Sequence, residues 1–96
     1  MPPWAMHLYT VLLDYAGGTY VSQLAASDEQ DALRRWLDKL GSERTAGEVS
    51  DEVATAFESM PDRPVLIEGL TNAWSASASE KGGLALVNIV RNVELT

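Results

Sequence analysis

The segment Met6–Tyr15 carries apolar side chains on both of its alternating rows. Its odd positions include Tyr9 and Val11, and its even positions include Leu8 and Leu12. A strand with one face in water would be polar on one of the two rows. The β-branched and aromatic residues also favour an extended chain. The pattern therefore predicts a strand near the middle of a sheet.

Gly17-Gly18 separates this strand from a second alternating segment, Tyr20–Ala25. Paired glycines favour a tight hairpin turn, because its central residues take positive φ. With both glycines at the tip, the register pairs Tyr15 with Tyr20, Leu13 with Ser22 and Val11 with Leu24. Polar residues in the second segment predict an edge strand.

A helix is predicted over Asp28–Leu40. Ser27 is the expected N-cap, with Gln30 reaching back to it, and Gly41 is the expected terminator. Helical spacing places five apolar residues on one stripe: Ala32, Leu33, Trp36, Leu37 and Leu40.

A second helix follows, with Ser50 or Thr45 as its N-cap and with Pro61–Pro64 as its end. Its predicted apolar stripe contains Val49, Val53, Ala56, Phe57 and Met60.

The last part of the chain predicts another hairpin. Asn72–Ser79 and Leu84–Val90 flank a glycine-containing turn, and the simplest register pairs Trp74 with Ile89 and Ala76 with Val87. The short apolar segment Val65–Ile67 before it reads as a core-anchoring loop or a brief strand.

The predicted order is β-β-α-α-β-β in one domain, residues 1–96, with residues 1–5 as a flexible tail. We expect an α+β two-layer sandwich, with a four-stranded antiparallel sheet in the order 2-1-4-3 and two helices on one face. The two helices can cover only one face of this sheet, yet the two central strands are apolar on both faces. Either the other face is an exposed apolar surface, or the sheet curls and Val65–Leu70 with Trp4 covers its back.

An exposed sheet face of this kind is typical of a partner surface, and a homodimer would use one patch twice. The residues predicted to form it are Tyr9, Val11, Leu13, Tyr15 and Tyr20, with Leu24, Leu86 and Val90 as further members.

The 96 residues contain fourteen acidic and seven basic side chains, a net charge of −7. This surplus disfavours nucleic-acid binding and attachment to an anionic membrane. Acidic residues gather on the second helix: Glu48, Asp51 and Glu52, with Glu58 and Asp62 beyond them. They form either a docking site for a basic protein or an ordinary solvated face.

The chain contains no cysteine, which excludes thiolate catalysis and favours a reducing cytoplasm. His7 is the single histidine, so neither a metal site nor a cofactor nor a catalytic residue is predicted. Three serines alternate along one predicted strand: Ser75, Ser77 and Ser79. They form either the solvent-exposed side of an edge strand or the lining of a polar pocket.

The glycine-tipped hairpin followed by an acid-capped helix resembles the first half of small antitoxin domains of the HicB type, and no functional residue is carried over. We expect a bacterial-type regulatory, antitoxin-like or immunity-like module without enzymatic activity. The alternative is a small-molecule-binding domain with a pocket between sheet and helices, lined by Trp36, Trp74 and Asn88.

Overall fold

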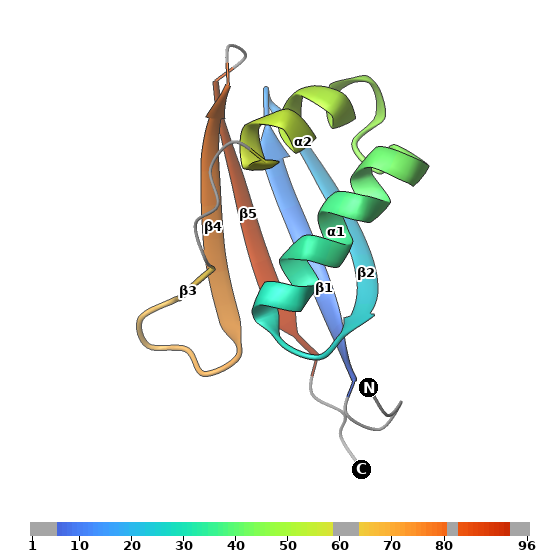
Figure 1. Ribbon diagram of the computed structural model, residues 1–96. Helices are drawn as coiled ribbons and strands as arrows, with labels where there is room; N and C mark the ends of the chain where they lie inside the picture. Colours follow the sequence, from blue (N-terminus) through green and yellow to red (C-terminus); the bar gives the residue numbers. More distant parts are fainter. Residues whose placement is uncertain (1–5, 59–63, 81–82, 93–96) are drawn as a thin grey trace.

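The computed structural model describes residues 6–58, 64–80 and 83–92 (Figure 1). The predicted tail, residues 1–5 with Trp4, lies outside this part of the chain, as do Met60 and Asp62. The elements follow one another as β1 (His7–Tyr15), β2 (Gly18–Ala26), α1 (Glu29–Glu43), the short 3-10 helix η2 (Gly47–Val49), α2 (Ser50–Glu58), β3 (Val65–Leu66), β4 (Ala73–Glu80) and β5 (Gly83–Arg91). None of the helices in the described ranges is long and apolar enough to cross a bilayer.

The strands form one antiparallel sheet in the order β2-β1-β5-β4-β3. The α+β class with two helices is confirmed, but the four-stranded sheet and its stated order are wrong. Val65–Leu66 adds a fifth strand, because pairing with Ser75 and Trp74 of β4 satisfies its backbone groups. It extends the sheet at its rim and does not cover its back. β1 and β5 lie side by side in the interior, each with two neighbours.

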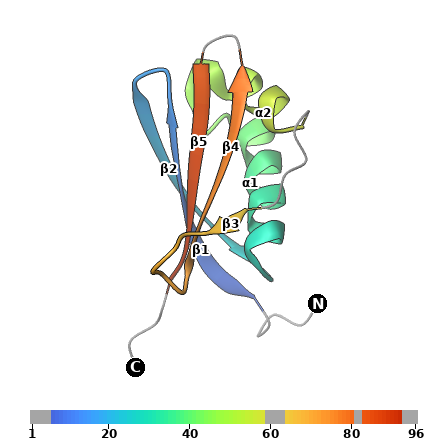
Figure 2. The same ribbon diagram turned by 90° about the vertical axis from the view of Figure 1, so that its left-hand side faces the viewer.

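Both helices lie on one side of the sheet (Figure 2). The core between the two layers is built around Trp36, which is 1% exposed. Its ring meets Phe57 of α2 edge-on, with ring centroids 5.7 Å apart and planes at 88°. Such T-shaped contacts are a favoured aromatic geometry. The sheet side of the core comes from alternate residues of β1, β5 and β4.

The first hairpin turns one residue earlier than predicted. Leu13 faces Tyr20, and the turn residues are Ala16 at φ 50° and Gly17 at φ 82°. Gly18 is not at the tip; it pairs with Tyr15 as the first residue of β2. A Cβ on Gly18 would lie 2.8 Å from the Tyr20 hydroxyl oxygen, so this glycine makes room for the tyrosine ring. Side-chain packing therefore sets this register.

The second hairpin has the predicted register. Trp74 pairs with Ile89 and Ala76 pairs with Val87. These four residues face the helices, and Ala76, Val87 and Ile89 are buried there.

Helix α1 begins with a cap that the sequence pattern placed one residue too early. Asp28, not Ser27, is the N-cap, and its carboxylate accepts the N–H of Asp31 at 2.7 Å. The residue that reaches back is Asp31, not Gln30, and it accepts the backbone N–H of Ser27 at 3.0 Å. That hydrogen bond, ahead of those from neighbouring arginines, holds the pKa of the Asp31 carboxyl well below its usual 3.8. Gly41 is a helical residue and not the terminator.

The C-terminal end of α1 is at Arg44, which takes φ 52° and donates its backbone N–H to the Leu40 carbonyl. The chain then enters α2 through η2. Ser50 is buried as the first residue of α2, and its Oγ accepts the Ala46 N–H at 3.1 Å. The stripe predicted for this helix is buried at Val53, Ala56 and Phe57.

Candidate interaction surface

The tyrosine row predicted to face a partner belongs to the core. Tyr9, Val11, Leu13 and Tyr15 are at most 2% exposed and face the helices. Tyr20 of β2 is half-buried and packs against the same core. The prediction of these residues as an exposed surface is wrong, because the larger of the two apolar rows of β1 fills the space under Trp36 and Phe57.

Two tyrosines of this row make side-chain contacts at the margins of the core, one polar and one aromatic. The Tyr15 hydroxyl donates to Glu52 Oε2 at 3.0 Å. The Tyr9 ring lies against Trp74, with centroids 6.2 Å apart. Burial raises the pKa of the Tyr9 hydroxyl, and the nearby positive charge of Arg91 opposes this effect. The Tyr15 hydrogen bond thus joins the sheet to α2, whereas the Tyr9–Trp74 contact lies within the sheet layer.

In the described ranges no helix lies on the opposite surface of the sheet, which we call the open face (Figure 2). The registers assign to it Leu8, Thr10, Leu12 and Asp14 of β1; Thr19, Val21, Gln23 and Ala25 of β2; Leu84, Leu86, Asn88 and Val90 of β5; Ala73, Ser75, Ser77 and Ser79 of β4; and Val65 of β3.

An apolar band crosses the open face over the three strands β2, β1 and β5. Leu12 lies directly beside Val21 of β2 and diagonally beside Leu86 and Val90 of β5. Residues at these spacings are in contact distance on a sheet surface. Val21 is 60% exposed, so the band is open to solvent at the β2 side. Leu86 and Val90 were expected on an outward face, and the register places them there.

Polar side chains beside the band bond to one another. Gln23 Nε2 donates to Thr10 Oγ1 at 3.0 Å, and that hydroxyl donates to Asn92 Oδ1 at 2.8 Å. Thr19 donates to Asp14 Oδ1 at 2.7 Å. Asp14 is the only ionisable residue among the described strand positions on the open face. This surface is therefore nearly neutral in a chain of net charge −7.

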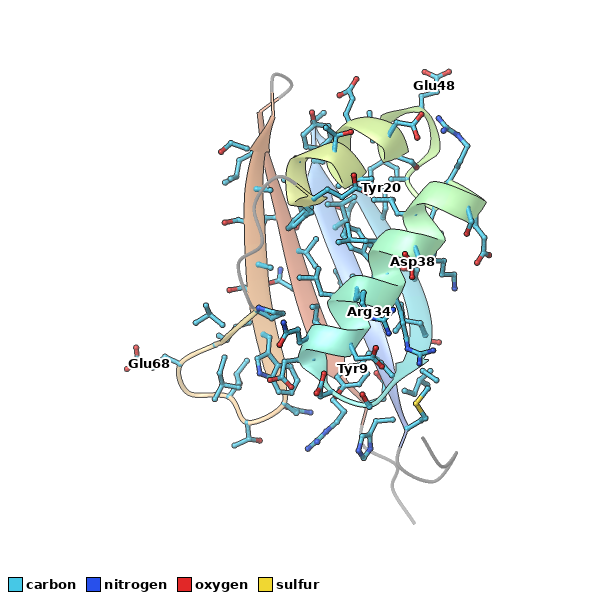
Figure 3. All side chains as sticks on the ribbon, in the orientation of Figure 1. Tyr9, Tyr20, Arg34, Asp38, Glu48 and Glu68 are labelled. Atoms are coloured by element: carbon cyan, nitrogen blue, oxygen red, sulfur yellow. The ribbon has the colours of Figure 1, made fainter. Side chains whose placement is uncertain are left out.

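Three acidic residues predicted to attract a basic partner lie in η2 and in the first turn of α2: Glu48 (labelled in Figure 3), Asp51 and Glu52. Asp51 forms an ion pair with Arg44 at 3.0 Å, and Glu52 accepts the tyrosine hydroxyl described above. Glu48 is exposed. Carboxylates in a first helical turn also interact favourably with the helix dipole. Two of the three thus have partners within the chain, and binding of a basic protein remains a prediction.

The three residues predicted to line a ligand pocket do not come together. Trp36 and Trp74 face the space between sheet and helices, whereas Asn88 lies between Leu12 and Ser75 on the open face. A pocket formed by all three is therefore wrong. Strand alternation explains it, since Asn88 and the buried Ile89 are consecutive and point to opposite faces.

The described residues contain no group of three or more His, Asp and Glu side chains that could hold a metal ion. His7 is exposed at the first position of β1.

Several open-face residues had not been singled out: Leu8, Leu12, Val21 and Leu84. The sequence did indicate which row faces outward, through the relative bulk of the two rows of β1. Two helices rich in large side chains need the row with two tyrosines beneath them, which leaves the smaller even row outside.

Comparison of this chain with protein-family models, with curated proteins and with solved structures finds no match.

Proposed function

We propose that this protein acts by protein–protein contact and that the open face joins two copies of the chain. The observation that carries the proposal is the position of the exposed large hydrophobic residues. Of the six large hydrophobic residues that are exposed in the described ranges, four lie on the open face and are between 46% and 66% exposed: Leu8, Val21, Val65 and Leu84. Apolar side chains gathered on one uncovered surface are typical of an interface.

Charge favours a second copy as the occupant of this surface. Two chains of net charge −7 repel each other, and this repulsion is smallest when the surfaces that meet carry few charges. The open face meets that condition, and its single carboxylate, Asp14, already accepts a hydrogen bond from Thr19. A twofold axis then uses the same patch on both subunits. Packed sheet faces of this kind stack about 10 Å apart.

The size of the face approaches that of a standard interface. Four of its strands are eight or nine residues long. At about 4.8 Å between strands and about 3.3 Å per residue, the flat footprint is about 500 Å². Side-chain relief adds to this area, toward the roughly 800 Å² per partner of a standard interface.

The proposal assigns no catalytic step to the chain. The regulatory, antitoxin-like or immunity-like role remains a prediction from size and charge. The cytoplasmic location remains a prediction from the absence of cysteine.

The test is the molar mass in solution, measured by light scattering at high micromolar concentration. We expect a mass above that of one chain for the wild type. The double variant Leu8→Glu/Leu84→Glu should halve it, because both exposed positions would carry charge into a symmetric contact. The matched control is Leu66→Glu/Leu70→Glu, which makes the same charge change at two exposed leucines outside the open face. A monomeric wild type, or a face variant with unchanged mass, would refute the proposal.

A further inference from the structure

The outer edge of β2 is the second surface that a partner can use. β2 is the terminal strand of the sheet, and all nine of its residues pair with β1 without a bulge. In the described part of the chain, no strand lies on its other side. A long edge strand of this kind is a template for a further strand.

The hydrogen-bond pattern identifies the backbone groups that point outward. The Leu8 carbonyl accepts the Asn92 N–H, so Leu8 and every second residue after it in β1 bond toward β5. The intervening β1 residues, starting with Tyr9, bond toward β2. Their partners on β2 are the even-numbered residues. The N–H and C=O groups of Thr19, Val21, Gln23 and Ala25 therefore point away from the sheet.

One contact agrees with this assignment and partly occupies the edge. Lys39 of α1 donates from Nζ to the Gln23 carbonyl oxygen at 2.9 Å. A lysine at an edge is one of the devices that limit strand addition. A carbonyl oxygen has two lone pairs, so Gln23 can accept a second donor while this bond persists.

The other protections common on edge strands are absent from β2. Residues Gly18–Ala26 include no charged side chain and no proline. The opposite rim of the sheet differs, because β3 is only two residues long and follows Pro64. β3 pairs only with Trp74 and Ser75, so in the described part of the chain the rest of β4 also has a free outer side, but β2 offers the longer continuous row of donors and acceptors.

We propose that β2 pairs antiparallel with β2 of a second copy, about a twofold axis at Ser22, and so joins two sheets into one. This axis passes through the central residue of the strand, so all nine residues of β2 pair with the second copy. In this register the outward groups of Thr19 meet those of Ala25, and those of Val21 meet those of Gln23, in both directions. Each of these is a pair of residues that exchange two hydrogen bonds.

The side chains suit the same register. Tyr20 of one copy faces Leu24 of the other on the helix side, and Val21 faces Gln23 on the open face. Aromatic–aliphatic pairs of this kind stabilise neighbouring strands. Because β2 itself carries no charged side chain, two acidic chains can approach along it without placing carboxylates of the paired strands side by side. This is the argument for a second copy as the occupant.

The edge contact is distinct from the open-face contact of the proposed function, and the two are geometrically compatible. A twofold axis between antiparallel strands of one sheet is perpendicular to that sheet. A twofold axis between two packed faces runs parallel to them. Two perpendicular axes that intersect generate a closed tetramer, the second commonest symmetric assembly after the dimer.

The deciding experiment compares Val21→Pro with Val21→Thr by light scattering. Proline removes an outward N–H and leaves the β1 pairing intact, which is the setting in which edge strands tolerate it. Threonine has the same shape as valine and keeps the N–H. We expect the proline variant to have half the mass of the threonine variant. Equal masses for the two folded variants would overturn the edge contact.

Combining this pair with Leu8→Glu/Leu84→Glu separates the two proposals. Loss of mass from the proline variant alone supports the edge and refutes the open face. Loss from the face variant alone refutes the edge. If both contacts exist, each change gives a dimer and the combination gives a monomer.

A second measurement decides the matter if the proline variant does not fold. Amide hydrogen exchange of the wild type should slow with rising protein concentration at Thr19, Val21, Gln23 and Ala25. Lys39→Met should give several-fold tighter association than Arg34→Met, which makes the same charge change elsewhere on α1. Concentration-independent exchange at all four amides, or weaker association of the Lys39 variant, would overturn the proposal.

Discussion

The substitution Ala16→Asn tests the register of the first hairpin. Ala16 occupies the first central position of the turn at φ 50°, followed by Gly17 at φ 82°. Positive φ at both central residues defines a type I′ turn, which favours Asn-Gly. Under the register predicted from Gly17-Gly18, the same alanine would be a strand residue, where asparagine is unfavourable. The two registers therefore give opposite signs.

The magnitude follows from the backbone conformation. A residue with a Cβ in the left-handed region is destabilised by about 1–2 kcal/mol, and asparagine recovers part of this through local hydrogen bonds. We expect the free energy of unfolding to rise by about 0.5–1 kcal/mol. For a domain of this size, a change of 1 kcal/mol moves the melting temperature by about 4–8 °C. The expected rise is thus about 2–8 °C.

The assay is thermal and urea unfolding followed by circular dichroism, at one fixed protein concentration because association shifts the transition. Ala25→Asn, at an exposed strand position of β2, is the matched control and should be slightly destabilising. Gly17→Ala should be destabilising by about 1 kcal/mol, because alanine is strained at φ 82°. If Ala16→Asn lowers the melting temperature as the control does, the observed register is wrong.

Three further predictions concern stability. Trp36→Ala should lower the free energy of unfolding by about 3–5 kcal/mol, measured in urea, because it empties the centre of the core; a loss below about 1 kcal/mol would contradict that position. Tyr15→Phe should lower it by about 1 kcal/mol, and little more should be lost when Glu52→Gln is added, as a double-mutant cycle would report. The lowered pKa of Asp31 implies a contribution that is complete above its usual 3.8 and is lost as the pH falls toward the native value. The stability difference between the wild type and Asp31→Asn should therefore shrink from pH 5 to pH 2 (about one unit above to about two below the usual value), and a constant difference would refute the assignment.

Local patterns predicted most of the secondary structure. Two apolar rows placed β1 and β5 inside the sheet, and the stripe containing Trp36 and Leu40 identified the buried side of α1. The second hairpin has the predicted register because the alternation of large and small residues along β4 and β5 favours a single pairing of the two strands. Errors at the caps were one residue or a few, since Ser27, Asp28 and Asp31 can all accept amide hydrogen bonds at a helix start.

The candidate surface was harder to predict, for a physical reason. A strand with two apolar rows shows that both faces meet apolar surroundings, but it does not say which row meets the helices. That depends on how well each row fills the space beneath Trp36 and Phe57, which are distant in sequence from β1. The row with Tyr9 was assigned to the outside, and packing placed it inside.

The amino-acid sequence by itself determined the α+β class, the positions of the helices and main strands, the acidic charge and the neutrality of β2. These depend on side-chain periodicity and composition, which are local. The tertiary structure decided the tip of the first hairpin, the fifth strand, the row of β1 left in solvent and the backbone groups exposed along β2. Each of these results from competition between distant segments for one packing space or one set of hydrogen bonds.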